Sequence, residues 1–390
     1  MTDGEQRAAL AVVRSLGRAG HQVHVVSARR NSLAGASRYA RTRSWLPDPL
    51  EAPEEFAAAV AALVRRHGIE VVLPITDASL FALGARREGL APALLPVPDC
   101  DRLRAVADKE LVTREAARHG IAVPRQVVAR CRSDVEAAAG TAVRYPLVLK
   151  PGRSLVSGAD GSVKLGVGLV NDPHELPDAL AALASAAYPL LLQERIAGPG
   201  IGVFLLLWGG SVRAAFMHRR LREKPPAGGV SVYRESIPLD DDLVRRSRAL
   251  LEGFQWEGVA MVEYKVDSRT GVPHLMEING RFWGSLQLAV DCGVDFPRWL
   301  VELARGRDPG VAPPYRVGLR SRWRWGDVDH LLARIRLSPQ ELALPPDAPA
   351  LGRVLLDVLV PWRPGDRDEI LRWSDPVPFL RETIDWFRRG

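Results

Sequence analysis

Cysteine is scarce in this sequence, with only Cys100, Cys131 and Cys292 among its 390 residues. Cysteines scattered this widely exclude a disulfide framework and a Cys-x-x-Cys zinc cluster. Long apolar runs are missing too, since a run such as Val203 to Trp208 is far shorter than the ~20 residues that span a membrane. The N-terminus, Met1 to Gln6, is polar and unlike a signal peptide. We therefore expect a cytoplasmic protein without a membrane span.

Lysine is rare as well, because it accounts for only five of the 53 basic residues and arginine for the other 48. An ammonium is a compact point charge and a guanidinium a planar fork, so lysines retained in such a chain are candidates for sites that need a point charge. These candidates are Lys109, Lys150, Lys164, Lys224 and Lys265. For Lys164 and Lys265, persistence on the surface by drift remains an alternative.

The charge pattern argues against a nucleic-acid partner. The net charge is +7, but acidic and basic residues are interspersed and no five like charges occur in a row. Basic and aromatic residues do mix between residues 311 and 390, around Trp323, Trp325, Trp362, Trp373 and Trp386. Base stacking is one interpretation of such a mixture. A small core or a homodimer contact is the interpretation that we favour.

The first hundred residues alternate between helical and strand patterns. The spacing of apolar residues predicts helices over Gln6–Ala19 and Glu54–His67 and strands over His21–Val26, Val71–Ile75 and Ala93–Val97. This alternation predicts an α/β domain with a mostly parallel sheet. No Gly-x-Gly-x-x-Gly turn follows a strand, which disfavours a dinucleotide fold. A strand is expected just before Asp3 and is missing, so we expect the chain to start one strand late.

The pattern changes after residue 105. Asp108 is predicted to cap a helix that runs to His119, and Tyr145–Lys150 reads as a buried strand. The glycine-rich segment Pro151–Gly168 that follows predicts a mobile loop and a candidate lid. The pair Gly209-Gly210 between two apolar runs predicts a hairpin of an antiparallel sheet.

Two acidic residues are predicted to meet on a second hairpin. Strands are expected over Gly258–Val266 and Pro273–Asn279, so that Met261, Glu263 and Lys265 share one face and Leu275, Glu277 and Asn279 share the facing one. The short connection, which contains the five-residue polar turn Asp267 to Gly271, can set Glu263 opposite Glu277. Like charges in that position need a cation between them, and two carboxylates with an amide suit Mg²⁺. A solvated hairpin face is the alternative.

Several motifs in order resemble the ATP-grasp superfamily. They are Asp108-Lys109 at a helix start, the strand Tyr145–Pro151, the strand end Gln193-Glu194-Arg195-Ile196, Glu263, and Met276-Glu277-Ile278-Asn279-Gly280-Arg281. The resemblance covers roughly residues 1 to 305 and is closest to carboxylate–amine ligases related to carbamoyl-phosphate synthase halves. Gly280 stands where relatives often have proline, which we expect only to loosen the turn.

The resemblance implies a domain order and a fold class. The fold would be α/β and α+β, with antiparallel sheets in a two-lobed ATP-grasp domain. The expected parts are a parallel pre-ATP-grasp domain at 1–105, a small lobe at 106–190, a large lobe with the metal site at 191–310 and a C-terminal appendage at 311–390.

The resemblance also implies roles for individual residues. Lys109 and Lys150 would hold the ATP phosphates, with Ser154 as a further phosphate contact. Glu263, Glu277 and Asn279 would bind Mg²⁺, with Mn²⁺ as the alternative ion. Adenine would contact Gln193, Glu194 and Ile196.

Four side chains are candidates for the reacting end of the site. Arg281 would face the transferring phosphoryl group or the substrate carboxylate, unless it is a structural ion-pair partner. Arg219 and Lys224 are phosphate or substrate candidates, with a solvated charge run as the alternative. For Asp77, substrate contact and helix capping both stay open.

The implied activity is an ATP-dependent carboxylate–amine ligase. A small carboxylic acid such as an amino acid would attack the γ-phosphate, and an amine would displace phosphate from the acyl phosphate to form an amide. An ATP-grasp kinase, a thiol ligase and a non-catalytic ATP-binding regulatory module are the alternatives.

Overall fold

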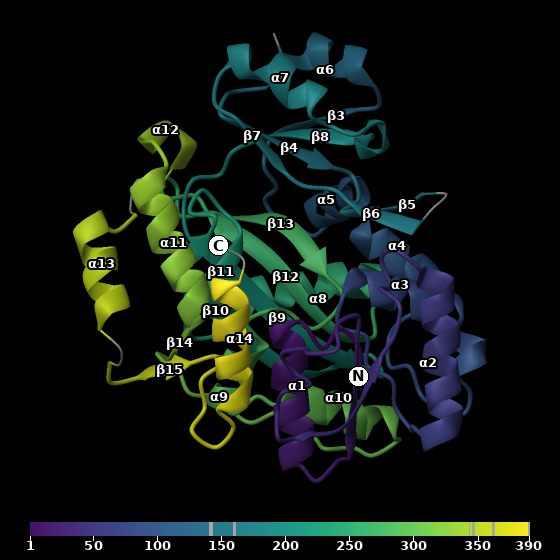
Figure 1. Ribbon diagram of the computed structural model, residues 1–390. Helices are drawn as coiled ribbons and strands as arrows, with labels where there is room; N and C mark the ends of the chain where they lie inside the picture. The colour runs from purple at the N-terminus through teal and green to yellow at the C-terminus, as the bar shows by residue number, and fades with distance from the viewer. Residues whose placement is uncertain (140–142, 159–160, 343, 345–347, 361–362, 389–390) are drawn as a thin grey trace.

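The computed structural model describes residues 1–139, 143–158, 161–342, 344, 348–360 and 363–388. Trp362 therefore lies outside the described residues. A small lobe sits above a large twisted sheet, and the N-terminal domain and the C-terminal helices flank that sheet on opposite sides (Figure 1). None of the helices in the described ranges has the length and apolarity needed to cross a membrane.

The N-terminal domain has the predicted α/β character. Its elements are α1 (Arg7–Arg18), β1 (Val23–Ser27), β2 (Ala40–Trp45), α2 (Pro53–His67), α3 (Asp77–Ala85) and α4 (Cys100–Ala107). Strands β1 and β2 pair in parallel, and every residue of β1 is buried. The predicted helices and the first strand are thus confirmed.

The two later strands of this domain were predicted wrongly. Residues 71–75 and 93–97 run side by side but pair only through the parallel bridge between Val71 and Leu94. Prolines supply the physical reason, because Pro74, Pro96 and others nearby lack the N–H that a ladder needs. Residues 1–4 fill the space beside β1, where the Met1 carbonyl accepts from the Val26 amide and the Thr2 amide donates to Leu73.

The small lobe carries an antiparallel sheet with strand order β3-β8-β4-β7. Its elements are α5 (Lys109–Arg118), β3 (Gln126–Ala129), α6 (Arg132–Ala139), β4 (Leu147–Pro151), β7 (Gly168–Val170), α7 (Leu176–Ala181) and β8 (Leu190–Glu194). The Asp108 side chain accepts a hydrogen bond from the Leu111 amide, which confirms it as the cap of α5.

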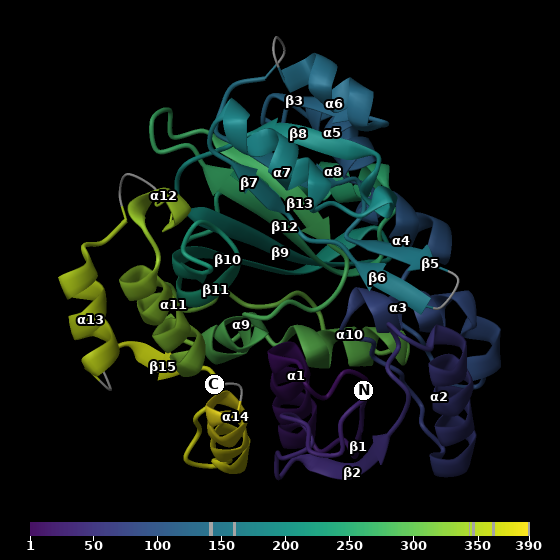
Figure 2. The ribbon, with the colours of Figure 1, turned by 45° about the horizontal axis from the view of Figure 1, so that its top comes forward.

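The glycine-rich segment is a hairpin rather than the predicted mobile loop. Strands β5 (Leu155–Gly158) and β6 (Gly161–Lys164) pair antiparallel, and the Ser162 amide donates to the Leu50 carbonyl at 2.7 Å. Gly161 has φ +125°, and a Cβ there would lie 2.6 Å from the Glu51 carbonyl oxygen. The glycine therefore serves close approach to the N-terminal domain (Figure 2).

The large sheet has the strand order β13-β12-β9-β10-β11-β14-β15. Its strands are β9 (Gly200–Trp208), β10 (Ser211–Lys224), β11 (Val230–Ser236), β12 (Gly258–Val266), β13 (Pro273–Asn279), β14 (Arg320–Arg322) and β15 (Asp366–Asp368). The remaining helices are α8 (Asp241–Gly253), α9 (Leu286–Cys292), α10 (Phe296–Ala304), α11 (Arg324–Arg336), α12 (Pro339–Leu342), α13 (Leu351–Leu359) and α14 (Val377–Phe387).

Alternating side chains divide the large sheet between two cores. Phe204 and Met261 belong to the core that includes α1, α9 and α10, whereas Leu205 and Val262 belong to the core on the opposite face, with α4, α5 and α8. Both faces of the central strands are therefore buried, which explains their near-continuous apolar sequence.

The C-terminal segment is tied to the N-terminal domain. Its strands β14 and β15 extend the large sheet, and α14 lies beside α1 in both views (Figures 1 and 2). The Arg14 guanidinium on α1 donates to Asp375 at 2.8 Å and to the Ile370 carbonyl at 2.8 Å. Arg14 and Asp375 are each only 1% exposed. A buried ion pair thus joins the two ends of the chain.

Candidate active site

Glu263 and Glu277 are direct partners across β12 and β13, as the sequence predicts. The prediction that Leu275 shares a face of β13 with Glu277 and Asn279 was wrong, because a register shift lies between Glu263 and Tyr264. Leu275 therefore packs with Tyr264 in the core and not beside Glu277. The irregularity brings the Met276 sulfur within 3.9 Å of the Lys150 ammonium.

Glu263 is paired with Arg220, a residue that sequence reasoning missed. The Arg220 guanidinium lies 2.6 Å from the Glu263 carboxylate and donates to Glu223 at 2.7 Å. Burial raises the pKa of the Glu263 carboxyl, Arg220 opposes this effect and Glu277 adds to it. Arg220 thus partly neutralises one half of the acidic pair.

Glu277 faces the other set of cations. The Asn279 amide donates to its carboxylate at 2.9 Å. Burial opposes ionisation of Glu277, but Lys109, the Asn279 hydrogen bond and Lys150 outweigh it and lower the pKa of this carboxyl. Glu277 is therefore held as a carboxylate between an amide and two lysines.

Lys109 and Lys150 come from different elements and approach the same acidic pair. Lys109 opens α5, is 7% exposed, and donates from its ammonium to the Ser154 hydroxyl at 2.8 Å. Lys150 lies on β4 of the small lobe. Burial lowers the pKa of Lys109, and it lowers the pKa of Lys150 to about 8, although Glu277 offsets part of the effect at both. Within the described residues neither ammonium has a carboxylate within 4.0 Å, so both are free to meet an anion.

Arg281 ends the acidic strand and spans the junction with the N-terminal domain. It donates to Asp77 at 3.0 Å, to the Asn279 side chain at 3.1 Å and to the Phe282 carbonyl at 3.2 Å. Asp77 is the first residue of α3, and the cap itself is Thr76. Asp77 is thus an ion-pair partner of Arg281 rather than the helix cap.

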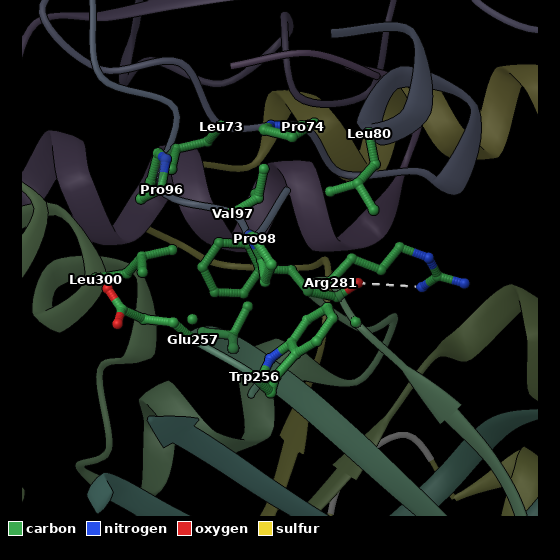
Figure 3. Close-up of a pocket in the computed structure, with 14 residues that line it drawn as sticks. Leu73, Pro74, Leu80, Pro96, Val97, Pro98, Trp256, Glu257, Arg281 and Leu300 are labelled. Carbon is green, nitrogen blue, oxygen red and sulfur yellow. Dashed lines mark hydrogen bonds between the residues drawn. The ribbon is translucent and has the colours of Figure 1, made fainter. Parts of the chain in front are cut away.

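The apolar pocket behind Arg281 is too small for a substrate. Its volume is about 10 Å³, room for at most one water molecule. Figure 3 shows Arg281 pointing away from the apolar side chains that line it. Gly280 lies in this wall, and a Cβ there would be 2.3 Å from the Trp256 ring. Proline or any other residue would clash, so the absence of proline is a packing requirement and not a looser turn.

The predicted adenine contacts lie at one end of the small-lobe sheet. Gln193 and Glu194 end β8, and Ile196 is half-buried in the connection to β9. The Glu194 amide donates to the Arg125 carbonyl at 2.8 Å. These residues occupy the connection between the two lobes, and their adenine contacts remain a prediction.

Arg219 and Lys224 are not brought to the acidic pair. Arg219 donates to Glu235 at 2.6 Å, and side-chain alternation places it on the face opposite Arg220. Lys224 pairs with Asp329 of the C-terminal segment. The alternation of side chains between the two faces of a strand could have favoured Arg220 over Arg219 as the residue that faces the acidic pair.

A large cavity extends from Arg281 and Ser154 to the C-terminal segment. It has a volume of about 670 Å³, within the range of small-molecule sites. The N-terminal domain, the β5–β6 hairpin and the helices α11 and α14 all contribute to its walls. The cavity joins the cationic end of the site to a wall that includes Trp325 and Trp386.

The oxygen donors fit Mg²⁺ in part. Two carboxylates and the Asn279 amide supply hard ligands of the type that Mg²⁺ prefers. Across the described ranges, no three His, Cys, Asp or Glu side chains cluster into a complete metal cage. An ion held by Glu263, Glu277 and Asn279 would need further oxygens, which phosphates facing Lys109 and Lys150 could supply.

The arrangement of the sheets is that of an ATP-grasp-like fold. Residues 186–325 match the protein family described as ATP-grasp in the biosynthetic pathway with Ter operon. A curated relative, the D-alanine–D-alanine ligase of Corynebacterium efficiens, is 24% identical over 228 residues, which are 54% of this chain and 61% of the relative. The chain thus matches less than two thirds of that relative's length.

Solved structures share the fold at low sequence identity. Biotin carboxylase of Campylobacter jejuni, in a β,γ-ATP complex, has a TM-score of 0.63 and is 16% identical, over 82% of this chain and 73% of that one. The L-amino acid ligase of Bacillus licheniformis has a TM-score of 0.61 and is 18% identical, over 80% and 76%. The predicted fold class is confirmed, and the match over residues 186–325 supports the resemblance to ATP-grasp proteins. The closer relation to carboxylate–amine ligases stays a prediction.

Proposed function

We propose that this protein is an ATP- and Mg²⁺-dependent carboxylate–amine ligase that activates a small carboxylic acid as an acyl phosphate. The observation that carries the proposal is the approach of the buried Lys109 and the partly buried Lys150 to the opposed Glu263–Glu277 pair. Arg281 lies at the edge of a 670 Å³ cavity beside them. Phosphoryl transfer needs little covalent chemistry from a protein and depends on positioning and charge stabilisation.

The cationic residues of the site bind anionic groups, and the acidic residues bind the metal ion. Lys109 and Lys150 hold the ATP phosphates, and Glu263, Glu277 and Asn279 hold the metal ion, which neutralises charge on the phosphate oxygens. Arg281 orients the substrate carboxylate toward the γ-phosphate. The carboxylate oxygen forms a bond to phosphorus as the bond to ADP breaks, and an amine then displaces phosphate from the carbonyl carbon.

The β5–β6 hairpin excludes water from this chemistry. It carries the Leu155 end of the cavity wall and contacts Leu50 of the N-terminal domain. An acyl phosphate hydrolyses in water, so an enclosed site protects it until the amine arrives.

The test measures ADP release with Mg²⁺, ATP, pooled amino acids and other small carboxylates, and hydroxylamine as a generic amine. ADP together with a hydroxamate is the expected result. ADP without hydroxamate would instead support an ATP-grasp kinase or a thiol ligase. ATP binding with no ADP from any pool would support the non-catalytic regulatory module.

Lys150→Met tests the site itself. We expect at least a tenfold weaker affinity for ATP in calorimetry, because a phosphate-binding charge is lost. Arg66→Met is the control for loss of a positive charge, since Arg66 lies exposed on α2 and does not line the cavity. Equal ATP affinities for wild type and Lys150→Met would overturn the proposed phosphate site.

A further inference from the structure

The far wall of the cavity comes from the C-terminal segment, for which the ligase chemistry has no use. Trp325 of α11 and Trp386 of α14 stack there with ring centroids 4.3 Å apart and an interplanar angle of 25°. The Trp325 indole donates to the Thr383 hydroxyl at 2.9 Å, and the Trp386 indole donates to Asp329 at 2.8 Å. Hydrogen bonds therefore fix both rings in place.

The same wall is acidic. Seven acidic and four basic side chains line the cavity, although the whole chain has a net charge of +7. Asp329, Glu382 and Asp385 supply the acidic groups of the C-terminal wall, but Asp329 pairs with Lys224 and Asp385 pairs with Arg381. One oxygen of Glu382 accepts from the Trp323 indole at 2.6 Å, and the other is buried with no hydrogen-bond partner among the described residues. Burial raises the pKa of Glu382 to about 7, and a cation bound beside the unpartnered oxygen would favour the carboxylate form.

The chain already places cations of its own against a neighbouring indole. The Arg7 guanidinium lies 3.9 Å from the ring centroid of Trp323, and the Lys224 ammonium lies 5.6 Å from it. In the described part of the chain, no arginine or lysine lies over Trp325 or Trp386. The stacked rings of Trp325 and Trp386 are thus available to bind a cationic group of a ligand.

We propose that Trp325, Trp386 and Glu382 form a subsite for a distal cationic group of the carboxylic acid substrate. The proposal rests on the ligase function above, which places the reacting carboxylate at Arg281. Asp77, the ion-pair partner of Arg281, is available for an α-ammonium group beside that carboxylate. The substrate class is therefore an amino acid or short peptide with a basic side chain, an amine or a guanidine.

The test compares ligands that differ only in the distal charge. L-Arginine and L-citrulline, and L-lysine and L-norleucine, are titrated into the full chain by calorimetry in the presence of Mg²⁺ and ADP. We expect the charged member of at least one pair to bind tenfold or more tightly than its neutral partner. Equal affinities within both pairs, or no binding of any of the four, would overturn the proposal.

Two variants locate the effect. Glu382→Gln keeps the side-chain shape, and Trp386→Leu removes one ring, so each should reduce the preference for the charged ligand at least threefold. Trp373→Leu is the matched control, because Trp373 is 91% exposed and does not line the cavity. A preference that both variants leave intact would place the cation elsewhere and refute the subsite.

The failure of the subsite can be told apart from the failure of the ligase proposal. Lys150→Met should lose ADP affinity and retain the preference for the charged amino acid. Wild-type protein that binds ADP and prefers neither ligand would refute the subsite alone. Protein that distinguishes arginine from citrulline but binds no ADP would refute the ligase function alone.

Discussion

Gly280 lies against the Trp256 ring so closely that a Cβ at this position would be 2.3 Å from the nearest ring carbon. Gly280 separates Asn279, a proposed metal ligand at the end of β13, from Arg281. The missing side chain therefore allows the end of β13 to settle against the N-terminal junction. Both neighbours belong to the proposed site, so packing at Gly280 sets the position of the site's last two polar groups.

Gly280→Ala should destabilise the protein by about 1–3 kcal/mol, because an inserted methyl group must displace a buried indole. The matched control is Gly352→Ala on α13, where a Cβ meets nothing within 4 Å and alanine favours the helix by ~0.5–1 kcal/mol. Urea unfolding of both variants measures the difference. A urea midpoint of Gly280→Ala at or above that of wild type would show that the Trp256 side chain can move aside without loss of stability.

Glu277→Gln should lower ADP release on the order of 100-fold, because it removes a proposed metal ligand and the countercharge of two lysines. Glu252→Gln is the control, since Glu252 lies exposed on α8 and pairs with Arg248 on the same helix. The rate is measured as a function of Mg²⁺ concentration. Unaltered Mg²⁺ dependence in Glu277→Gln would exclude this carboxylate as a ligand.

ATP affinity should weaken as the pH rises through about 8. Burial lowers the pKa of Lys150 from 10.5 to about 8, so the ammonium that holds phosphate is lost above that value, by up to ~tenfold per pH unit. Lys150→Arg keeps its charge and should flatten the profile. Bound phosphate would shift the midpoint upward, which a comparison of ATP with adenosine reveals.

The same shift has the opposite sign for stability. A cation whose pKa is lower in the folded state favours unfolding while it is charged, so the contribution of Lys150 to the free energy of unfolding increases between about pH 8 and 10.5. Loss of ATP affinity in this range would therefore not report unfolding. A fall of the melting temperature that matched the loss of affinity would contradict this explanation.

The acidic hairpin could be predicted because local rules determine it. Two strands with a short connection set Glu263 opposite Glu277, and side-chain alternation put both toward the cations. Arg220 was missed because the register shift between Val212 and Ala214 breaks the alternation counted along β10 from the Gly209-Gly210 turn. His218 and Arg220 are two residues apart and share one face of β10. Counting side-chain alternation from His218 would therefore have placed Arg219 on the face away from the site.

The C-terminal strands could not be predicted by the same rules. Strand β14 reads Arg-Ser-Arg and β15 reads Asp-Arg-Asp, so neither has apolar alternation. Long-range polar contacts place them instead, such as the hydrogen bond from the Tyr233 hydroxyl to Asp366 at 3.0 Å and the ion pair of Arg234 with Glu369. Contacts between residues more than a hundred positions apart produce no periodic pattern in the sequence. The cavity wall that depends on them could therefore not be predicted.

Asp375→Asn should loosen the C-terminal segment while leaving the ATP site intact. Asp375 accepts hydrogen bonds from Arg14 at 2.8 Å, from the Ser37 hydroxyl at 2.7 Å and from the Arg38 amide at 2.9 Å. Neutralising it leaves the Arg14 guanidinium buried without its countercharge, a change that costs about 3–5 kcal/mol in comparable pairs.

Asp375→Asn should affect the binding of the carboxylic acid more than the binding of ATP. We expect Asp375→Asn to raise the KM for the carboxylic acid more than tenfold and the KM for ATP less than twofold, because α14 lines the cavity and not the lysine pair. Asp101→Asn is the control, since its pair with Arg104 is exposed. Limited proteolysis should cut Asp375→Asn earlier within 363–388 than wild type. Parallel increases in both KM values would mean that the ion pair between the two ends of the chain supports the whole fold rather than the cavity wall.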